Sequence, residues 1–378
     1  MKNRKKDVTL KRGKFVKNIK IGAGLLVAVW MILVIMGWTF NDKAISEGER
    51  RPLKQKPELK VESLLDGSYM KEFEEYVLDQ FPFRDGFRKM KSIVHYYGFQ
   101  QKDNNGIYIY KDHANKMDYP LNRPSVDFAI NRFNRIYDSY LKGKTGKIVM
   151  AMVPDKGYYM AKDSGHLTYD YNRLMERASE KIPWAEHVKV SDLLDLNDYY
   201  RTDTHWRQEK ILPVAERLGE KLGVTVCKDY KYEKIERDFY GVYYGQAALP
   251  MKPDRILLMK NSMLDQCKVY DHEKGEYLPI YNMEKAQGRD MYETYLSGAK
   301  ALLEIENPKG IQGKELIVFR DSFASSLIPL LLESYSKVTL IDTRYITTEQ
   351  LGHLVDFKGA DVLFLYNTLL INNSAVLK

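Results

Sequence analysis

The sequence lacks several of the patterns that would make its function easy to assign. Its 378 residues contain only two cysteines, Cys227 and Cys267, and seven histidines. His-x-x-x-His, Cys-x-x-Cys and the usual zinc spacings are absent, so no metal site is predicted. No glycine-rich phosphate loop follows a strand, so we expect no nucleotide cofactor. Internal repeats and low-complexity segments are missing as well.

The body of the chain also lacks net charge. The formal charge of +8 comes from residues 1–20, which hold nine Lys and Arg residues and one acid, Asp7. The rest of the chain keeps 50 basic and 50 acidic residues. A basic surface for nucleic acid is therefore not expected, because the excess charge sits in a terminal tail.

An apolar segment directly after the tail explains its charge. Residues 21–40 contain no charged side chain, and twenty helical residues at ~1.5 Å each span the ~30 Å core of a bilayer. We expect a transmembrane helix with Trp38 near one interface. The basic tail places the N-terminus in the cytoplasm by the positive-inside rule. A cleaved signal peptide is the competing interpretation, but the apolar stretch is longer than a typical signal core and no clear cleavage site comes after it.

The membrane segment predicts the location of the rest of the chain. Residues 41–378 are expected outside the cytoplasm at the cell membrane, where a disulfide between Cys227 and Cys267 is permitted. Two free thiols are an equally good expectation, because surface proteins of Gram-positive bacteria often avoid disulfides.

Hydrophobic periodicity predicts the domain organisation. Residues 41–60 are polar and contain Pro52 and Pro57, which is typical of a stalk, and spacings of three and four predict an antiparallel helical pair, packed on the body, within residues 61–97. We therefore assign residues 41–100 to a stalk with juxtamembrane helices and residues 101–378 to an extracytoplasmic domain.

Within residues 101–378, apolar runs alternate with amphipathic stretches. We predict strands at 107–110, 147–153, 188–190, 315–319, 337–341 and 361–366, and helices at 125–141, 171–181, 207–222, 323–335 and 347–355. Such alternation is typical of a parallel sheet between helix layers. Residues 223–300, rich in Tyr, Gly and Lys, interrupt it and are predicted to form a β-rich insertion.

One short segment carries an acid and a base together. Asp203 and His205 are two residues apart in Tyr199–Trp206, and on an extended segment both side chains would point to the same face. Taken alone, the histidine also fits a structural role, and Asp203 also fits a cap for the helix at 207–222.

The best partner for this pair is Ser322, which follows the apolar strand 315–319 and precedes a helix. Ligands of open α/β sheets bind beyond the carboxyl ends of strands, and a serine there lies beside free N–H groups of a helix start. The pair Asp321-Ser322 fits a plain helix cap equally well. Together with Asp203 and His205, Ser322 would complete a hydrolytic triad.

These residues carry a resemblance. Asp203-Thr204-His205-Trp206, with Asp321-Ser322-Phe323 about 120 residues later and a membrane segment ahead of both, resembles the DHHW family and the related alginate O-acetyltransferases. Supporting pieces are spread along the chain at residues 81–85, 153–156, 243–246, 295–298 and 341–345. The sequence departs from the pattern at two positions: Thr204 replaces the second motif residue, His, and Arg320 stands where Gly often precedes Asp-Ser.

The resemblance implies a membrane-anchored domain like those of the SGNH hydrolases. Carried over, Ser322 would be the nucleophile, His205 the general base and Asp203 its orienting carboxylate. Ser322 and Gly298 would supply backbone N–H groups to the oxyanion, and Arg320, Trp206 and Tyr295 would contact substrate.

The implied activity is O-acyl transfer, most simply of acetyl groups, to a cell-surface polysaccharide or exopolysaccharide. A membrane-bound O-acyltransferase would supply the acyl group across the membrane. The tyrosine pairs at 158–159, 199–200, 243–244 and 292–295 fit stacking platforms for sugars, and fit half-buried strand residues as well. Two alternatives remain open: a carbohydrate esterase with the same triad, and a non-catalytic polysaccharide-binding or assembly protein.

Overall fold

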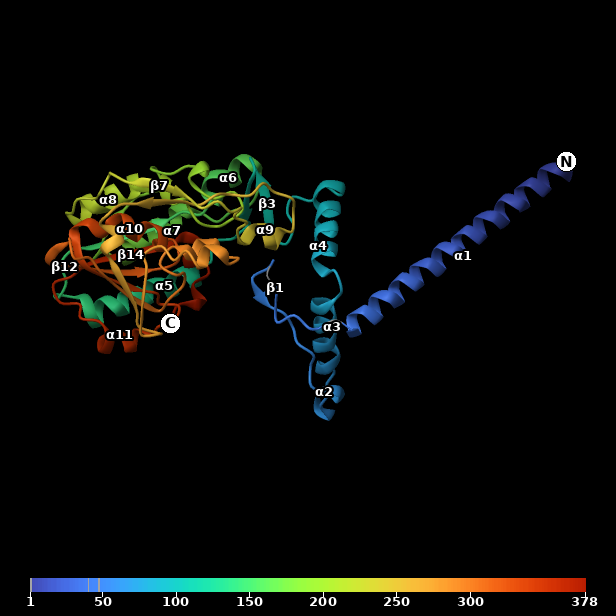
Figure 1. The fold of residues 1–378 in the computed structure, drawn as a ribbon, viewed down its shortest axis with the longest axis horizontal. Coiled ribbons are helices and arrows are strands. Elements are labelled where there is room, and N and C mark those ends of the chain that lie inside the picture. The colour runs from blue at the N-terminus through green and yellow to red at the C-terminus, as the bar shows by residue number, and fades with distance from the viewer. Residues whose placement is uncertain (1, 40, 47) are drawn as a thin grey trace. The chain divides into compact units, whose positions relative to one another are not determined.

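The computed structural model describes the backbone of residues 2–39, 41–46 and 48–378, and their side chains except at 2–16, 34 and 37–39. The chain divides into two compact units, Met1–Val94 and His95–Lys378. Figure 1 labels several of the elements of each unit.

The first unit consists of helices and a small two-stranded sheet. Its elements are α1 (Lys2–Thr39), β1 (Ile45–Ser46), β2 (Arg51–Pro52), α2 (Val61–Leu65), α3 (Ser68–Gln80) and α4 (Arg84–Ile93). Three helices replace the predicted pair, because Gly67 before α3 and Phe83 before α4 both have a positive φ that a continuous helix does not allow. The guanidinium of Arg51 donates to both carboxylate oxygens of Asp79, at 2.8 and 2.6 Å, and so fixes residues 51–54 against α3.

Residues 21–39 of the predicted membrane segment lie in α1. In the described part of the chain, no helix is long and apolar enough to cross a membrane. Within residues 21–40, residue 40 and the side chains of 34 and 37–39 lie outside the described residues.

The second unit is built on one eight-stranded sheet in the order β10-β9-β11-β13-β12-β14-β5-β6. Its strands are β5 (Ile148–Val153), β6 (Glu186–Val188), β9 (Lys268–Asp271), β10 (Glu276–Leu278), β11 (Leu302–Glu306), β12 (Ile311–Arg320), β13 (Tyr335–Ile341) and β14 (Asp361–Asn367). The strands from β13 to β6 in this order are parallel to one another, whereas β11, β9 and β10 pair antiparallel.

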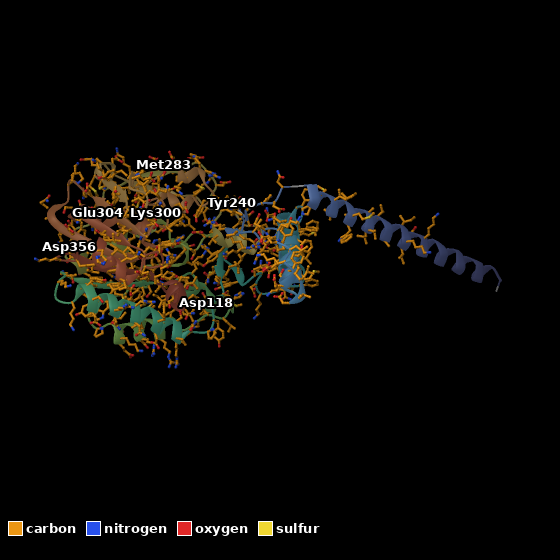
Figure 2. All side chains as sticks on the ribbon, turned by 90° about the horizontal axis from the view of Figure 1, so that it is seen from below. Asp118, Tyr240, Met283, Lys300, Glu304 and Asp356 are labelled. Carbon is orange, nitrogen blue, oxygen red and sulfur yellow. The ribbon has the colours of Figure 1, made fainter. Side chains whose placement is uncertain are left out.

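The sheet is therefore mixed, and the expectation of a parallel sheet with a separate β-rich insertion is wrong in part. Within residues 223–300, β9 and β10 extend the main sheet beyond β11. An ion pair of 2.7 Å between Lys300, just before β11, and Asp271 of β9 helps to hold this edge; Lys300 is labelled in Figure 2.

Helices cover both faces of the sheet. The helices α8 (Leu212–Leu222) and α10 (Ala324–Leu331) pack on one face. The opposite face carries α5 (Arg123–Ile136), α7 (Tyr171–Lys181), α11 (Thr348–Leu354) and α12 (Thr368–Asn372). In β12, Leu316 and Val318 belong to the first core, and Ile317 and Phe319 belong to the second. This alternation explains why residues 316–319 of β12 form a continuous apolar run in the sequence.

Smaller elements complete the second unit. They are β3 (Ile107–Tyr110), β4 (His113–Lys116), α6 (Gly157–Ser164), β7 (Lys231–Lys234), α9 (Val242–Ala247) and β8 (Leu257–Lys260). A π-helical turn at Tyr137–Leu141 extends α5, and 3-10 turns precede α8 at Gln208–Lys210 and follow α10 at Leu332–Ser334. These turns account for the longer helices that the periodicity predicts there.

The connections around β12 determine where a site can form. From β12 the chain passes through α10 to β13 on one side, and then through α11 to β14 on the other side of β12. Since α10 and α11 cover opposite faces, the strand order reverses at β12. Crevices in open α/β sheets form at the carboxyl end of such a strand, and Ser322 comes directly after that end.

Candidate active site

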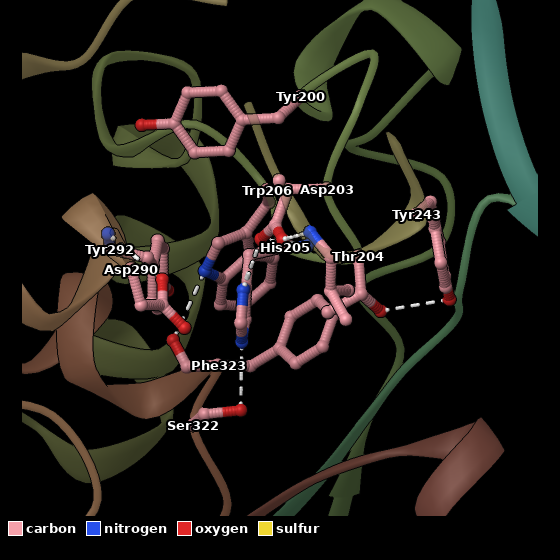
Figure 3. Close-up of polar contacts among 12 residues, drawn as sticks. Tyr200, Asp203, Thr204, His205, Trp206, Tyr243, Asp290, Tyr292, Ser322 and Phe323 are labelled. Carbon is pink, nitrogen blue, oxygen red and sulfur yellow. Dashed lines mark hydrogen bonds and ion pairs between the residues drawn. The ribbon is translucent and has the colours of Figure 1, made fainter. Parts of the chain in front are cut away.

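Three predicted side chains form one hydrogen-bonded series. The Nδ1 atom of His205 lies 2.6 Å from Oδ2 of Asp203, and its Nε2 atom lies 2.8 Å from Oγ of Ser322. Figure 3 shows the imidazole between the carboxylate and the hydroxyl. Asp203 is fully buried and His205 is 7% exposed, whereas Ser322 is half-buried.

The partners of His205 fix the tautomer of a neutral ring. An ionised carboxylate can only accept hydrogen bonds, so Nδ1 carries the proton that it donates to Asp203. Nε2 is then left as an acceptor, and the hydroxyl of Ser322 donates to it. The arrangement can therefore remove a proton from Ser322 and hold the resulting imidazolium beside a buried carboxylate.

The segment that carries Asp203 and His205 is a tight loop, so the expectation of an extended strand is wrong. Tyr199 and Trp206 form an isolated antiparallel bridge, and the Tyr200 N–H donates to the His205 carbonyl at 3.0 Å. Residues 201–205 bend between these points. Tyrosines favour strands on average, but tertiary hydrogen bonds override that preference here.

Two other segments hold this loop in place. The carboxylate of Asp254 accepts the backbone N–H groups of Arg201 and Thr202, both at 2.8 Å. The Val242 N–H donates to Asp203 Oδ1 at 2.8 Å. Just before it, Gly241 approaches so closely that a Cβ there would lie 2.1 Å from Cβ of Asp203. The alternative role of Asp203 as a helix cap is therefore wrong, because its carboxylate is directed to His205 and Val242.

Aromatic rings fix the plane of the imidazole. The ring of Tyr292 stacks on His205 with centroids 3.7 Å apart and an interplanar angle of 4°. Phe323 contacts His205 as a tilted ring at 5.0 Å. The Tyr292 hydroxyl and Ser326 Oγ are 2.8 Å apart, and burial raises the pKa of Tyr292. His205 therefore has little freedom to rotate away from Ser322.

Ser322 lies in the turn between β12 and α10. The neighbouring carboxylate of Asp321 accepts the Phe323 N–H at 2.9 Å and the Asn367 N–H at 2.6 Å, and burial raises the pKa of Asp321. Asp321 thus caps this turn and ties it to the end of β14. The pair Asp321-Ser322 can therefore serve both purposes: Asp321 caps the turn, and Ser322 presents its hydroxyl to His205.

The Ser322 hydroxyl faces a cleft of about 790 Å³. Thr204, Ser322, Arg344 and Asn367 contribute to its walls, and residues 369–377 add apolar side chains. The cleft is large enough for part of a sugar chain or an acyl group.

Four further predicted site residues do not lie where the resemblance places them. The Gly298 N–H donates to the Tyr295 carbonyl at 3.1 Å, so Gly298 acts as a turn glycine and not as an oxyanion donor. Arg320, Trp206 and Tyr295 are fully buried and present no side chain to a substrate. The indole N–H of Trp206 donates to the Phe323 carbonyl at 3.1 Å, so Trp206 packs under the site.

The tyrosine pairs and the cysteines also have structural roles. Tyr199, Tyr200, Tyr243, Tyr292 and Tyr295 are buried, so they offer no sugar platform, and Tyr158, Tyr159 and Tyr244 are half-buried. Cys227 and Cys267 are both free thiols.

Sequence patterns missed several residues that shape the site. Asp254, Gly241 and Tyr292 come from the irregular segment 223–300, where no periodicity marks a position. The only signal near Gly241 was the family resemblance, which includes residues 243–246 but not Gly241 itself.

Comparisons with known proteins show which family and which folds the chain is similar to. The family model described as DHHW protein matches residues 166–341. The resemblance to the DHHW family is thereby confirmed. No curated protein matches the chain.

Solved structures share the fold. A DHHW family protein from Eubacterium siraeum matches with a TM-score of 0.54 and 18% identity, over 71% of this chain and 93% of its own. PatB1 from Bacillus cereus matches with a TM-score of 0.53 and 15% identity, over 70% of this chain and 96% of its own. A second PatB1 structure, with a TM-score of 0.52, 15% identity and coverage of 70% and 95%, holds a sulfonyl adduct. The DHHW resemblance thus extends to an α/β fold with a large mixed sheet flanked by helices.

Proposed function

We propose that this protein is an O-acyltransferase, most simply an O-acetyltransferase, that modifies a cell-surface polysaccharide or exopolysaccharide through an acyl ester on Ser322. The observation that carries the proposal is the position of His205 within hydrogen-bond distance of both Asp203 and Ser322. A buried carboxylate, an imidazole and a partly exposed hydroxyl in this order are the parts of a nucleophilic acyl-transfer site.

Each residue has one role in the proposed reaction. His205 Nε2 takes the proton of Ser322 Oγ as the oxygen attacks the carbonyl carbon of the donor, and Asp203 stabilises the imidazolium. His205 returns the proton to the leaving group, and the acyl group stays on Ser322. A sugar hydroxyl then gives its proton to His205 as its oxygen attacks the acyl carbon, and His205 returns that proton to the Ser322 oxygen as the ester bond to serine breaks.

The oxyanion of each tetrahedral intermediate needs N–H donors. The Ser322 N–H lies in the turn that leads into α10, where backbone N–H groups are oriented toward an anion at the helix start. Because the Gly298 N–H is already bonded, we assign no oxyanion role to Gly298.

The proposed location determines the donor. With residues 21–40 as a membrane anchor and the second unit outside the cytoplasm, cytoplasmic acyl-CoA is out of reach. A membrane-bound O-acyltransferase would then pass acyl groups across the membrane to Ser322. The basic tail and the apolar segment of the sequence support this orientation.

Replacing Ser322 by Ala tests the proposal. We expect the release of 4-nitrophenol from 4-nitrophenyl acetate to fall by about four to six orders of magnitude, as it does when a catalytic triad loses a member. The matched control is Ser179→Ala, because Ser179 is an exposed serine on α7 in the same unit. Equal turnover by the Ser322→Ala variant and the wild type would refute the proposal.

Product analysis separates transfer from hydrolysis, because both reactions share the acyl-serine. With an O-acetyl donor and a candidate polysaccharide together in water, a transferase yields acetylated polysaccharide, and an esterase yields only free acetate. A binding or assembly protein would retain the polysaccharide but would leave Ser322 unmodified by serine-reactive probes.

A further inference from the structure

Lys156 is a fully buried lysine beside the proposed catalytic loop. It lies three residues after the end of β5, and its whole side chain is shielded from solvent. Burying an ammonium group is costly unless hydrogen bonds and nearby charges replace its water. The hydrogen bonds of Lys156 therefore indicate which part of the unit the buried ammonium stabilises.

The ammonium donates three hydrogen bonds, and all three go to the same loop. Nζ donates to the backbone carbonyls of Tyr200 at 2.8 Å, Arg201 at 3.2 Å and Asp203 at 2.7 Å. An ammonium group has three N–H donors and no lone pair, so it satisfies three carbonyls. A neutral amine has two donors and would turn its lone pair toward the third carbonyl.

The loop is therefore held on both sides of its backbone. Asp254 accepts N–H groups of Arg201 and Thr202, while Lys156 donates to carbonyls of the same stretch. Asp203 accepts two of these hydrogen bonds: its backbone carbonyl accepts one from Lys156, and its carboxylate accepts one from the Val242 N–H. The direction in which Asp203 and His205 point thus depends on these contacts.

The charged and titratable groups around the ammonium come from several elements. The carboxylates of Asp155, Asp203 and Asp254 favour its charge, and the ring face of Tyr243 in α9 lies 5.1 Å from Nζ. Burial lowers the pKa of His113 in β4, and the charge of Lys156 lowers it further. Burial outweighs the favourable groups and lowers the pKa of Lys156 to about 7.

We propose that Lys156 is a positioning residue whose ammonium form holds the loop of residues 200–203 so that Asp203 and His205 face Ser322. Loss of the proton removes one of the three hydrogen bonds and loosens the loop. The part of this inference that concerns activity rests on the proposed acyl-transfer function. The part that concerns the shape of the loop rests only on the hydrogen bonds of Lys156.

The required charge states give the pH profile of activity a definite sign. Lys156 must be charged, so activity falls as pH rises through its pKa of about 7. The stability contribution of Lys156 has the opposite sign. Its folded pKa lies below the value of about 10.4 in an unfolded chain, so this contribution to the free energy of unfolding increases as pH rises through that window. The stability contribution of Lys156 therefore does not account for an alkaline loss of activity.

Three variants test the inference. We expect Lys156→Met to lower kcat for 4-nitrophenyl acetate by about 100-fold with little change in KM, because the loop shifts while the cleft remains. In Lys156→Arg, the guanidinium stays charged, so any activity that remains should lose its alkaline decline. The matched control is Lys147→Met, because Lys147 donates to the carbonyl of Lys221 at 3.1 Å, away from the loop, and should behave like the wild type.

Amide hydrogen exchange separates this inference from the proposed function. Peptides covering residues 199–206 should exchange faster in Lys156→Met than in the wild type, while peptides of β12 and β14 stay unchanged. Unchanged exchange in 199–206 would overturn the inference, whatever the activity. A wild-type protein without any acyl-enzyme chemistry would overturn the proposed function and leave the exchange result to decide the role of Lys156.

The wild type provides a second route should Lys156→Met unfold the whole unit. After correction for intrinsic exchange rates, the exchange of peptides from 199–206 should rise relative to those of β12 as pH passes from 6 to about 9, through the titration range of the buried lysine. Parallel exchange of both regions over that range would overturn the inference.

Discussion

At the scale of single residues, the site depends on holding His205 in one orientation. Asp203 and Ser322 determine which ring nitrogen donates a hydrogen bond and which accepts one, and Tyr292 determines the plane of the ring. Only the first two could be found from the sequence, because an acid, a histidine and a serine form a known chemical pattern. Tyr292 has no such pattern, since a tyrosine that stacks on an imidazole looks like any other aromatic residue in the sequence.

Variants of Tyr292 test this role of the stacked ring. Tyr292→Leu removes the face on which His205 rests, and we expect kcat for 4-nitrophenyl acetate to fall between about 10- and 100-fold as the imidazole gains freedom. The matched control is Tyr292→Phe, which keeps the ring and loses only the hydroxyl contact to Ser326. Equal kcat values for the Leu and Phe variants would show that stacking does not position His205.

At the scale of elements, the sheet that positions Ser322 was largely predictable. The parallel strands β5 and β14 and the second half of β12 are buried on both faces, so their continuous apolar runs mark them clearly. The short strands β9 and β10 lie at one end of the sheet. Buried side chains alternate with less buried ones in β9, β10 has no buried side chain, and neither strand has a comparable apolar run. The sequence therefore predicted a parallel sheet without these two strands, whereas the observed sheet includes them and is mixed.

The loop that carries Asp203 and His205 shows a second limit of sequence patterns. Its shape comes from contacts with Asp254, Lys156 and the segment at Gly241, which are distant along the chain. Local propensity favours a strand at Tyr199-Tyr200, and distant contacts produce a bent loop. The prediction that Asp203 and His205 act together was useful although the predicted backbone was wrong.

Gly241 provides a test of this close packing. In Gly241→Ala, the added methyl group would meet the backbone of Asp203, so we expect the loop to shift and kcat to fall about 100-fold. Gly86→Ala is the matched control, since a Cβ at Gly86 in α4 meets no atom within 4 Å and alanine favours a helix. Wild-type kinetics in the Gly241→Ala variant would contradict the proposed packing.

At the scale of the whole molecule, the proposal requires an anchored protein with its second unit outside the cytoplasm. The apolar segment 21–40 and the basic tail before it predict this orientation from the sequence. The fold itself carries no information on location, because the sheet and its cleft would form on either side of a membrane.

Membrane fractionation of cells that express the full chain tests the anchor. We expect the wild type in the membrane fraction, with a C-terminal tag that added protease removes from intact protoplasts. Replacing both Val29 and Met31 by Lys should release the protein, because each lysine at the centre of a spanning helix costs about 2.5 to 3.5 kcal/mol. Val29→Leu with Met31→Leu is the control that keeps the segment apolar. A soluble wild type, or a tag that stays protected, would contradict the proposed orientation.

The central claim is that His205 activates Ser322 as a nucleophile, and a serine-reactive sulfonyl fluoride tests it most directly. The full-length protein is treated with the probe, and mass spectrometry of its peptides locates the adduct. We predict one adduct on Ser322, formed much more slowly in His205→Ala and absent in Ser322→Ala. A wild-type protein in which Ser322 stays unlabelled, or is labelled equally fast without His205, would contradict this claim.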